Sequence, residues 1–89
     1  GLVRRDRYIH LGVKCEPAQD RLIELESIIQ DSVDAKIQWR RYEVSQAENS
    51  ITYSFQMLGK EDEEWYLLVK RLLRVNGVKE VELKESKVT

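Results

Sequence analysis

Apolar and polar residues alternate along four segments of the chain, as they do in a half-buried β-strand. The segments are residues 7–15, 35–45, 51–58 and 78–84. The alternation is clearest in 51–58, where Tyr53 and Phe55 are predicted to face the core while Thr52 and Ser54 face outward. The pattern therefore predicts four strands, with 7–15 and 51–58 the most apolar on their inner faces.

Segment 35–45 breaks its own alternation. Ile37 and Trp39 would share one face of a regular strand, whereas Tyr42 and Val44 would share the other. One extra residue, a β-bulge near Arg40-Arg41, would return all four apolar side chains to the core face. Bulges and charged side chains are both frequent at sheet edges, so this segment is predicted to be an edge strand.

Between the strands the apolar spacing changes to the 3.6-residue period of an α-helix. One helix is predicted to run to Val33, with Pro17 as its first residue, since proline loses no hydrogen bond there, and Ala18 near the apolar stripe. A second helix is expected to open at 61–64, where four acidic residues suit the positive end of the helix dipole. Gly77 is expected just after its end, in the position that favours a left-handed backbone.

The resulting order is β-α-β-β-α-β, and right-handed crossovers restrict its topology. It indicates an α+β fold, the ferredoxin-like sandwich, in which two helices cover one face of a four-stranded antiparallel sheet. The first and third strands would be central, and the second and fourth would be edges. Residues 7–84 would form the domain, 1–6 the end of a linker and 85–89 a frayed tail. Because the chain starts Gly1-Leu2-Val3, we expect a piece of a longer protein or a processed chain.

Composition excludes several classes of function. Fifteen Lys and Arg oppose sixteen Asp and Glu, whereas nucleic-acid arms and polybasic membrane patches need a net positive field. The longest apolar run, 65–69, is far shorter than the roughly 20 residues that cross a bilayer. The single cysteine, Cys15, excludes an intramolecular disulfide and a cysteine-based metal site. We expect no nucleic-acid partner, no cofactor and no insertion of this chain into a membrane.

The residues that could carry catalysis do not form a known constellation. His10 is the only histidine, and its position in the alternation is on the outer face of the sheet. Cys15 has the inward parity and no Cys-His-Asn arrangement around it, so we interpret it as a core residue. The acids at 61–64 would diverge by about 100° per residue along a helix and could not converge on one ion. A non-enzymatic domain is predicted.

Arg40 and Arg41, flanked by Trp39 and Tyr42, are the best candidates for recognition. Basic and aromatic residues on a sheet of this topology can stack nucleic-acid bases. The third strand, however, lacks the aromatic-glycine signature of such modules. We therefore expect self-association or partner docking through an edge strand or the outer face of the sheet. The second strand is the preferred edge, with Arg40, Arg41 and Tyr42 nearest the contact.

Three stretches resemble ACT and ACT-like domains: 8–13, 51–57 and 72–81, the last of which closes a helix on Gly-Val-x-x-Val. More narrowly, residues 7–84 look like the cytoplasmic C-terminal domain of the bacterial MgtC/SapB membrane proteins. The resemblance implies a regulatory domain that follows a transmembrane segment, with 1–6 as a juxtamembrane remnant. It also implies a place at the cytoplasmic face of the inner membrane, a link to magnesium homeostasis, and a second copy or the parent's membrane domain as partner.

Two functions stay open at this point. The first is a non-catalytic regulatory or assembly domain whose partner is a second copy or the parent's membrane domain. The second is a small-molecule sensor of the ACT type, with an amino acid or similar ligand bound between a neighbouring subunit and the loop residues Glu16, Pro17, Gln19 and Asp20. That loop lacks the glycine-containing turn usual in ligand-binding ACT domains. It also lacks the arginine that an acylphosphatase-like enzyme of this topology would need to bind an anion.

Overall fold

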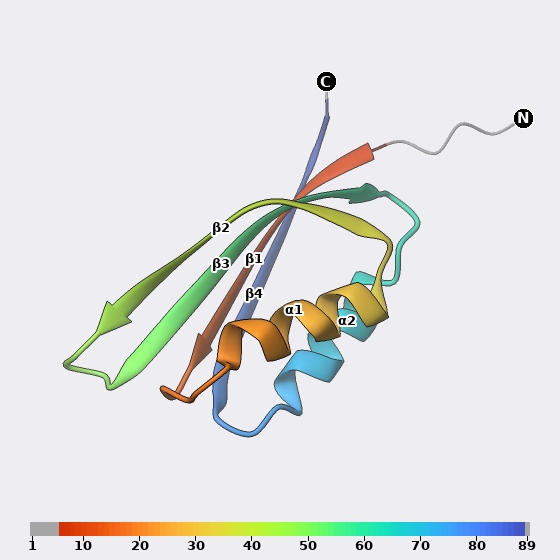
Figure 1. The fold of residues 1–89 in the computed structure, drawn as a ribbon. Coiled ribbons are helices and arrows are strands. Elements are labelled where there is room, and N and C mark those ends of the chain that lie inside the picture. The colour runs from red at the N-terminus through yellow and green to blue at the C-terminus, as the bar shows by residue number, and fades with distance from the viewer. Residues whose placement is uncertain (1–5, 89) are drawn as a thin grey trace, which may run out of the picture.

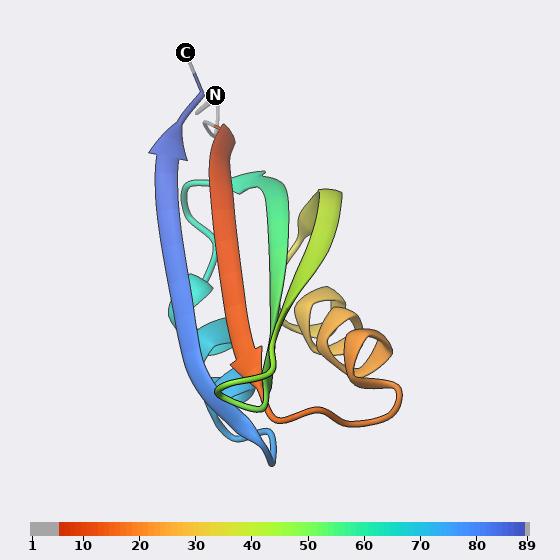
Figure 2. The same cartoon turned by 90° about the vertical axis from the view of Figure 1, so that its left-hand side faces the viewer.

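The computed structural model describes residues 6–88, and its elements follow the predicted order. They are β1 (Asp6–Cys15), α1 (Arg21–Ser32), β2 (Ala35–Ser45), β3 (Ser50–Lys60), α2 (Trp65–Leu73) and β4 (Val78–Lys87). The strands form one antiparallel sheet in the order β2-β3-β1-β4, so β1 and β3 are central, as predicted. Both helices lie on the same side of this sheet (Figure 1 and Figure 2). The ferredoxin-like sandwich is therefore confirmed.

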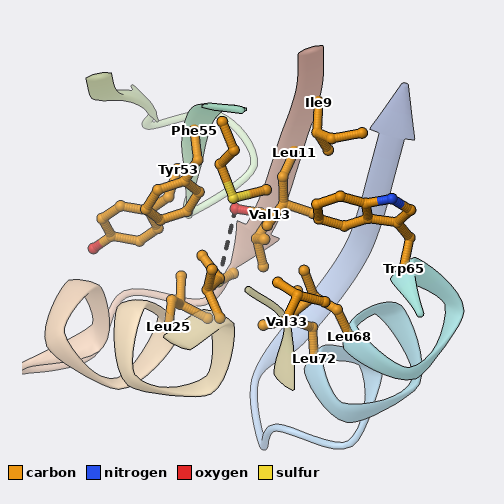
Figure 3. Close-up of a cluster of buried hydrophobic side chains, with 13 residues drawn as sticks. Ile9, Leu11, Val13, Leu25, Val33, Tyr53, Phe55, Trp65, Leu68 and Leu72 are labelled. Carbon is orange, nitrogen blue, oxygen red and sulfur yellow. Dashed lines mark hydrogen bonds between the residues drawn. The ribbon is translucent and has the colours of Figure 1, made fainter. Parts of the chain in front are cut away.

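The core lies between the sheet and the two helices (Figure 3). Every second residue of β1 and β3 points into it, so that Leu11 and Phe55 pair across the two strands and are fully buried. Leu25 of α1 and Leu68 of α2 meet them from the other layer and are also fully buried. Each such side chain contributes about 1.5–3 kcal/mol through burial. The predicted inward positions of β1 and β3 are thus confirmed.

Helix α1 begins later than predicted. Pro17 is not its first residue, because the helix starts at Arg21 and Asp20 is the N-cap. Asp20 has a φ of 59°, a left-handed conformation that turns the chain before the helix can form. Ala18 consequently lies in an exposed loop rather than on the apolar stripe. A local backbone turn, and not the spacing of apolar residues, therefore decides where this helix begins.

Helix α2 is also shorter than predicted. It starts at Trp65, so the acids at 61–64 precede it, and it ends at Leu73 with Arg74 as the C-cap. Gly77 does adopt a left-handed φ of 92°, but it does so in the turn that leads into β4. The glycine is needed by that turn and does not itself terminate the helix.

The strands run further than predicted at several ends. Asp6 belongs to β1, and Gly59 and Lys60 extend β3 instead of forming its exit turn. Residues 85–87 continue β4 and pair with β1, so the predicted frayed tail is wrong for them. Residues 1–5, most of the predicted linker, and residue 89 lie outside the described residues.

The bulge in β2 exists but lies earlier than predicted. Ile37 pairs with Met57 and Trp39 pairs with Gln56, so Gln38 is the extra residue. Trp39 therefore faces the side of the sheet without helices, and its predicted place on the core side is wrong.

Beyond the bulge, Tyr42 and Val44 do point to the helix side, opposite Tyr53 and Ile51. They are nevertheless 65% and 66% exposed. In Figure 1 the far end of the β2–β3 hairpin projects past α1, so neither helix covers this part of the sheet. The face is apolar there, but no layer of the chain buries it.

Candidate functional site

The predicted contact residues Arg40, Arg41 and Tyr42 lie in the middle of β2, at the edge of the sheet, and all three are exposed. They do not share one face. Arg40 and Tyr42 pair with buried residues of β3 and point to the helix side, whereas Arg41 pairs with Ser54 and points to the other side. These residues therefore share the backbone edge of β2, but their side chains do not form one patch.

A hollow of about 330 Å³ lies beside this edge, between α1 and the projecting part of β2. Leu22 of α1 is half-buried against the core at one wall, and the rings of Tyr42 and Tyr53 form another, with centroids 6.3 Å apart. Burial raises the pKa of the Tyr53 phenol, so its hydroxyl stays neutral. The hollow is thus a mostly apolar groove, with Arg40 and Arg41 also in its lining, and it suits an apolar side chain of a partner.

Arg40 is held at one end of this groove. Its Nε contacts Oε1 of Glu26 on α1, and the Glu26 side chain is three-quarters buried. The ion pair joins the uncovered part of β2 to the helix layer, so Arg40 does not offer a free charge to a partner. Nothing in the periodic pattern predicts this pair, because it depends on how α1 crosses the sheet.

The predicted ligand loop, Glu16, Pro17, Gln19 and Asp20, is exposed throughout. Its backbone is tied down, because Glu16 N donates a hydrogen bond to the Gly77 carbonyl oxygen at 2.8 Å.

Arg21 lies behind this loop and was not predicted from the sequence. It is 7% exposed, donates from Nη1 to Glu24 at 2.8 Å and from Nη2 to the Glu16 carbonyl at 3.5 Å, and leaves Nε without a partner among the described residues. The burial of Arg21 could not be predicted from the sequence, because arginine is mostly an exposed residue.

The side of the sheet without helices, the open face, has a shallow hollow of about 290 Å³ around Gly12. At one rim, the rings of His10 and Trp39 lie 6.5 Å apart, and the Arg41 guanidinium lies 5.4 Å from the Trp39 ring centroid.

At the other rim of the open face, Lys14 forms an ion pair with Glu48 of the β2–β3 turn. The hydrogen bond between them raises the pKa of Lys14 and lowers that of Glu48, so the two shifts agree.

Cys15 is fully buried at the end of β1, as predicted. Its Sγ donates weakly to the Val13 carbonyl oxygen at 3.8 Å, and burial raises the pKa of the thiol. Within residues 6–88, no three His, Cys, Asp or Glu side chains gather in a way that could hold a metal ion. None of the helices described is long and apolar enough to cross a membrane.

No protein-family model and no curated protein matches this sequence. Solved structures with similar folds include the crystal structure of the ACT domain from GTP pyrophosphokinase of Chlorobium tepidum, with a TM-score of 0.70, 18% identity and coverage of 89% of this chain and 99% of that one. The solution structure of the same ACT domain gives a TM-score of 0.69, 18% identity and coverage of 89% and 86%.

The C-terminal domain of the MgtC protein from Mycobacterium tuberculosis is also similar. Its solution structure has a TM-score of 0.70 at 18% identity, and the match covers 98% of this chain and 94% of that one. These likenesses show the fold, and they confirm the ACT-like fold that the sequence resemblance implies.

Proposed function

We propose that this ACT-like domain is a non-catalytic regulatory or assembly domain that self-associates through the β2 edge. The observation that carries the proposal is an edge strand whose uncovered apolar side chains, Tyr42 and Val44, lie beside the open groove between α1 and β2. An edge strand offers unpaired backbone N–H and C=O groups to another strand. A second copy can add its own β2 to this edge and bury both side chains.

The sequence of β2 favours one antiparallel register for this contact. Pairing centred on Tyr42 sets each Arg41 opposite Glu43 of the second copy, so two opposite-charge pairs form across the strands. Centring the pair on Arg41 or on Glu43 would instead oppose like charges. Each favourable cross-strand pair contributes about 0.2–1 kcal/mol, which is enough to select the register.

The likeness to the MgtC C-terminal domain supports a wider setting for the same role. In that setting the domain belongs to a bacterial membrane protein and lies at the cytoplasmic face of its membrane. A second copy, or the membrane domain of the parent protein, is then the partner. A link to magnesium homeostasis would belong to the parent protein.

One observation favours a second candidate, the small-molecule sensor. The buried Nε of Arg21 has no acceptor among the described residues, and it lies behind the loop that contains Glu16 and Asp20. A carboxylate that entered behind this loop would supply the acceptor. An amino acid is therefore the class of ligand to test.

Sedimentation equilibrium of the 89-residue chain at several concentrations tests the assembly role. We expect a reversible dimer that Glu43→Arg weakens about tenfold, because arginines then face each other in the Tyr42-centred register. Adding Arg41→Glu to Glu43→Arg should restore this edge contact. Glu64→Arg makes the same charge change at the exposed N-cap of α2, outside β2, and should leave the association unchanged.

A monomer at every concentration, or an association that Glu43→Arg does not weaken, would contradict the β2 contact. A mass that changes only when a pool of amino acids is added would favour the sensor instead.

A further inference from the structure

We propose that the open face of the sheet is a second self-association surface, on which another copy of this chain stacks face to face. The face is formed by all four strands, and both helices lie on the other side (Figure 1). A twofold rotation about an axis parallel to the strands brings β2 over β4 of the second copy and β3 over its β1. This surface is distinct from the β2 edge, so the inference goes beyond the proposed function.

The central row of the open face is complementary to itself. The strand register aligns Arg41, Ser54, Gly12 and Glu82 across the sheet, in that order. The twofold rotation reverses the row, so each Arg41 meets Glu82 of the second copy and each Ser54 meets Gly12. Arg41 is exposed, and the Glu82 side chain is 53% exposed. Glu82 pairs with Lys84 of its own strand at 3.3 Å, and a solvent-exposed pair of this kind is weak enough to exchange for a partner's arginine. Two ion pairs result, with small residues between them.

Gly12 has no evident role within a single copy. Its φ is not in the left-handed region, and a Cβ added there would meet its nearest atom, Cβ of Glu82, only at 3.9 Å, which is ordinary contact. Glycine inside a strand weakens the strand, and it often marks a place where another backbone approaches closely. With Ser54 it makes the middle of the face low, so that Arg41 and Glu82 can reach across the roughly 10 Å between stacked sheets.

The next row repeats this complementarity with different chemistry. It aligns Trp39, Gln56, His10 and Lys84. Reversal brings the Lys84 ammonium over the Trp39 indole, which is 41% exposed, in a cation–π contact. It also brings the Gln56 amide beside the His10 ring, where the two side chains can hydrogen-bond.

The rows at the two ends of the face differ, because the contacts between copies are favourable in one and unfavourable in the other. At one end Leu58 and Tyr8 pair across β3 and β1, so reversal forms two apolar contacts. At the other end reversal brings Glu43 near Glu80 of the second copy, a like-charge contact. Lys14 lies in that row and attracts Glu80, which reduces the repulsion. The stack is therefore favourable in three rows and unfavourable in one.

The area of the open face fits a weak dimer of this kind. Four strands about 4.8 Å apart, with ten or eleven residues each rising about 3.3 Å, give a face of roughly 600 Å² per copy. The total of about 1,200 Å² lies at the lower limit of specific interfaces. Arg41, Lys14 and Lys84 on this face are balanced by Glu43, Glu80 and Glu82, and such a mixture of charges matches a second copy better than a nucleic acid.

Mixing two variants, each substituted at one exposed residue, tests this stack. Arg41→Glu and Glu82→Arg each put like charges against each other in a stacked homodimer, and we expect each to lower its association constant about tenfold. Arg41→Glu also sets like charges against each other at the β2 edge, so Glu82→Arg, which lies outside that edge, is the variant that isolates the stack. In an equimolar mixture of the two variants, both ion pairs re-form: the unchanged Arg41 and Glu82 pair as before, and the two substituted positions pair with reversed polarity. The mixture should therefore regain association to within about threefold of the unchanged chain, as measured by sedimentation equilibrium.

Several results would overturn the stack. The first is an unchanged association constant for Glu82→Arg, and the second is a mixture that associates no better than its components. Glu43→Arg separates the two surfaces, because it removes the repulsion from Glu80 in the stack while it weakens the β2 edge. Concentration-dependent amide shifts in the unchanged chain give an independent check, since they must include His10, Gly12, Ser54 and Gln56 if the face is covered.

Discussion

Replacing Gly59 by alanine should destabilise the domain, although the change adds one methyl group. Gly59 is a buried residue of β3, and its backbone φ is one that alanine can adopt. A Cβ there would lie 2.6 Å from Cη2 and from Cζ2 of Trp65, the first residue of α2, which is only 8% exposed. The indole must therefore move, and α2 with it, before the methyl group fits.

Two opposing effects set the magnitude. Forcing a methyl group into a packed core costs about 1–3 kcal/mol. Alanine also restricts the unfolded chain, which returns about 0.4–1 kcal/mol. The net loss should be about 1–2 kcal/mol, out of roughly 4–13 kcal/mol for a domain of 89 residues. In thermal unfolding this corresponds to a fall in Tm of about 5–15 °C.

Urea unfolding followed by tryptophan fluorescence measures this loss, and the chain supplies a matched control. Gly12→Ala makes the same change in β1, but its Cβ meets nothing closer than 3.9 Å. At concentrations where the chain is monomeric, Gly12→Ala should be neutral or stabilising by up to about 1 kcal/mol. The two glycines differ mainly in the presence of Trp65.

A double-mutant cycle attributes the effect to the indole. Trp65→Phe removes the ring atoms that a Cβ on Gly59 would strike. In that background Gly59→Ala should cost little, which gives a coupling free energy of at least about 1 kcal/mol. Equal losses for Gly59→Ala with tryptophan and with phenylalanine at position 65, or equal effects of Gly59→Ala and Gly12→Ala, would refute the reasoning.

Three further predictions concern the loops and the buried thiol. Gly77→Ala should destabilise the domain by about 1–3 kcal/mol in urea unfolding, because its φ of 92° disfavours a side chain and its Cβ would lie 2.6 Å from Nη2 of Arg21; an unchanged midpoint would contradict this. Cys15 should react with an alkylating reagent far more slowly in the folded chain than in urea, because burial raises its pKa, and the same shift should lower stability as pH rises past the ordinary thiol pKa; equal reaction rates would count against it. Lys14→Met should raise the lowered pKa of the Glu48 carboxyl toward its ordinary value in an NMR titration, and the contribution of that carboxylate is lost as pH falls through the lowered pKa; an unmoved titration would show that Lys14 is not the cause.

The candidate contact residues show where sequence reasoning stops. Arg40, Arg41 and Tyr42 could be assigned to an edge strand, because charges and a broken alternation are both features of edges. The face to which each side chain points could not be predicted, because it depends on where the bulge lies. The pattern put the bulge about two residues later than Gln38, where the structure has it. The burial of Arg21 could not be predicted either, since it depends on a contact with the loop before β4.

The amino-acid sequence by itself determined the class of the fold, the order of its strands and the buried positions of β1 and β3. The reason is that period-two and 3.6-residue patterns reflect which residues leave water, and the hydrophobic effect dominates that choice. Local turns such as that at Asp20, and the lengths of helices and strands, needed the structure. Only the tertiary structure decided which exposed side chains lie together: the groove beside β2 and the row that contains Arg41 and Glu82 depend on pairing registers between distant segments, and a shift of one residue would turn each side chain to the other face.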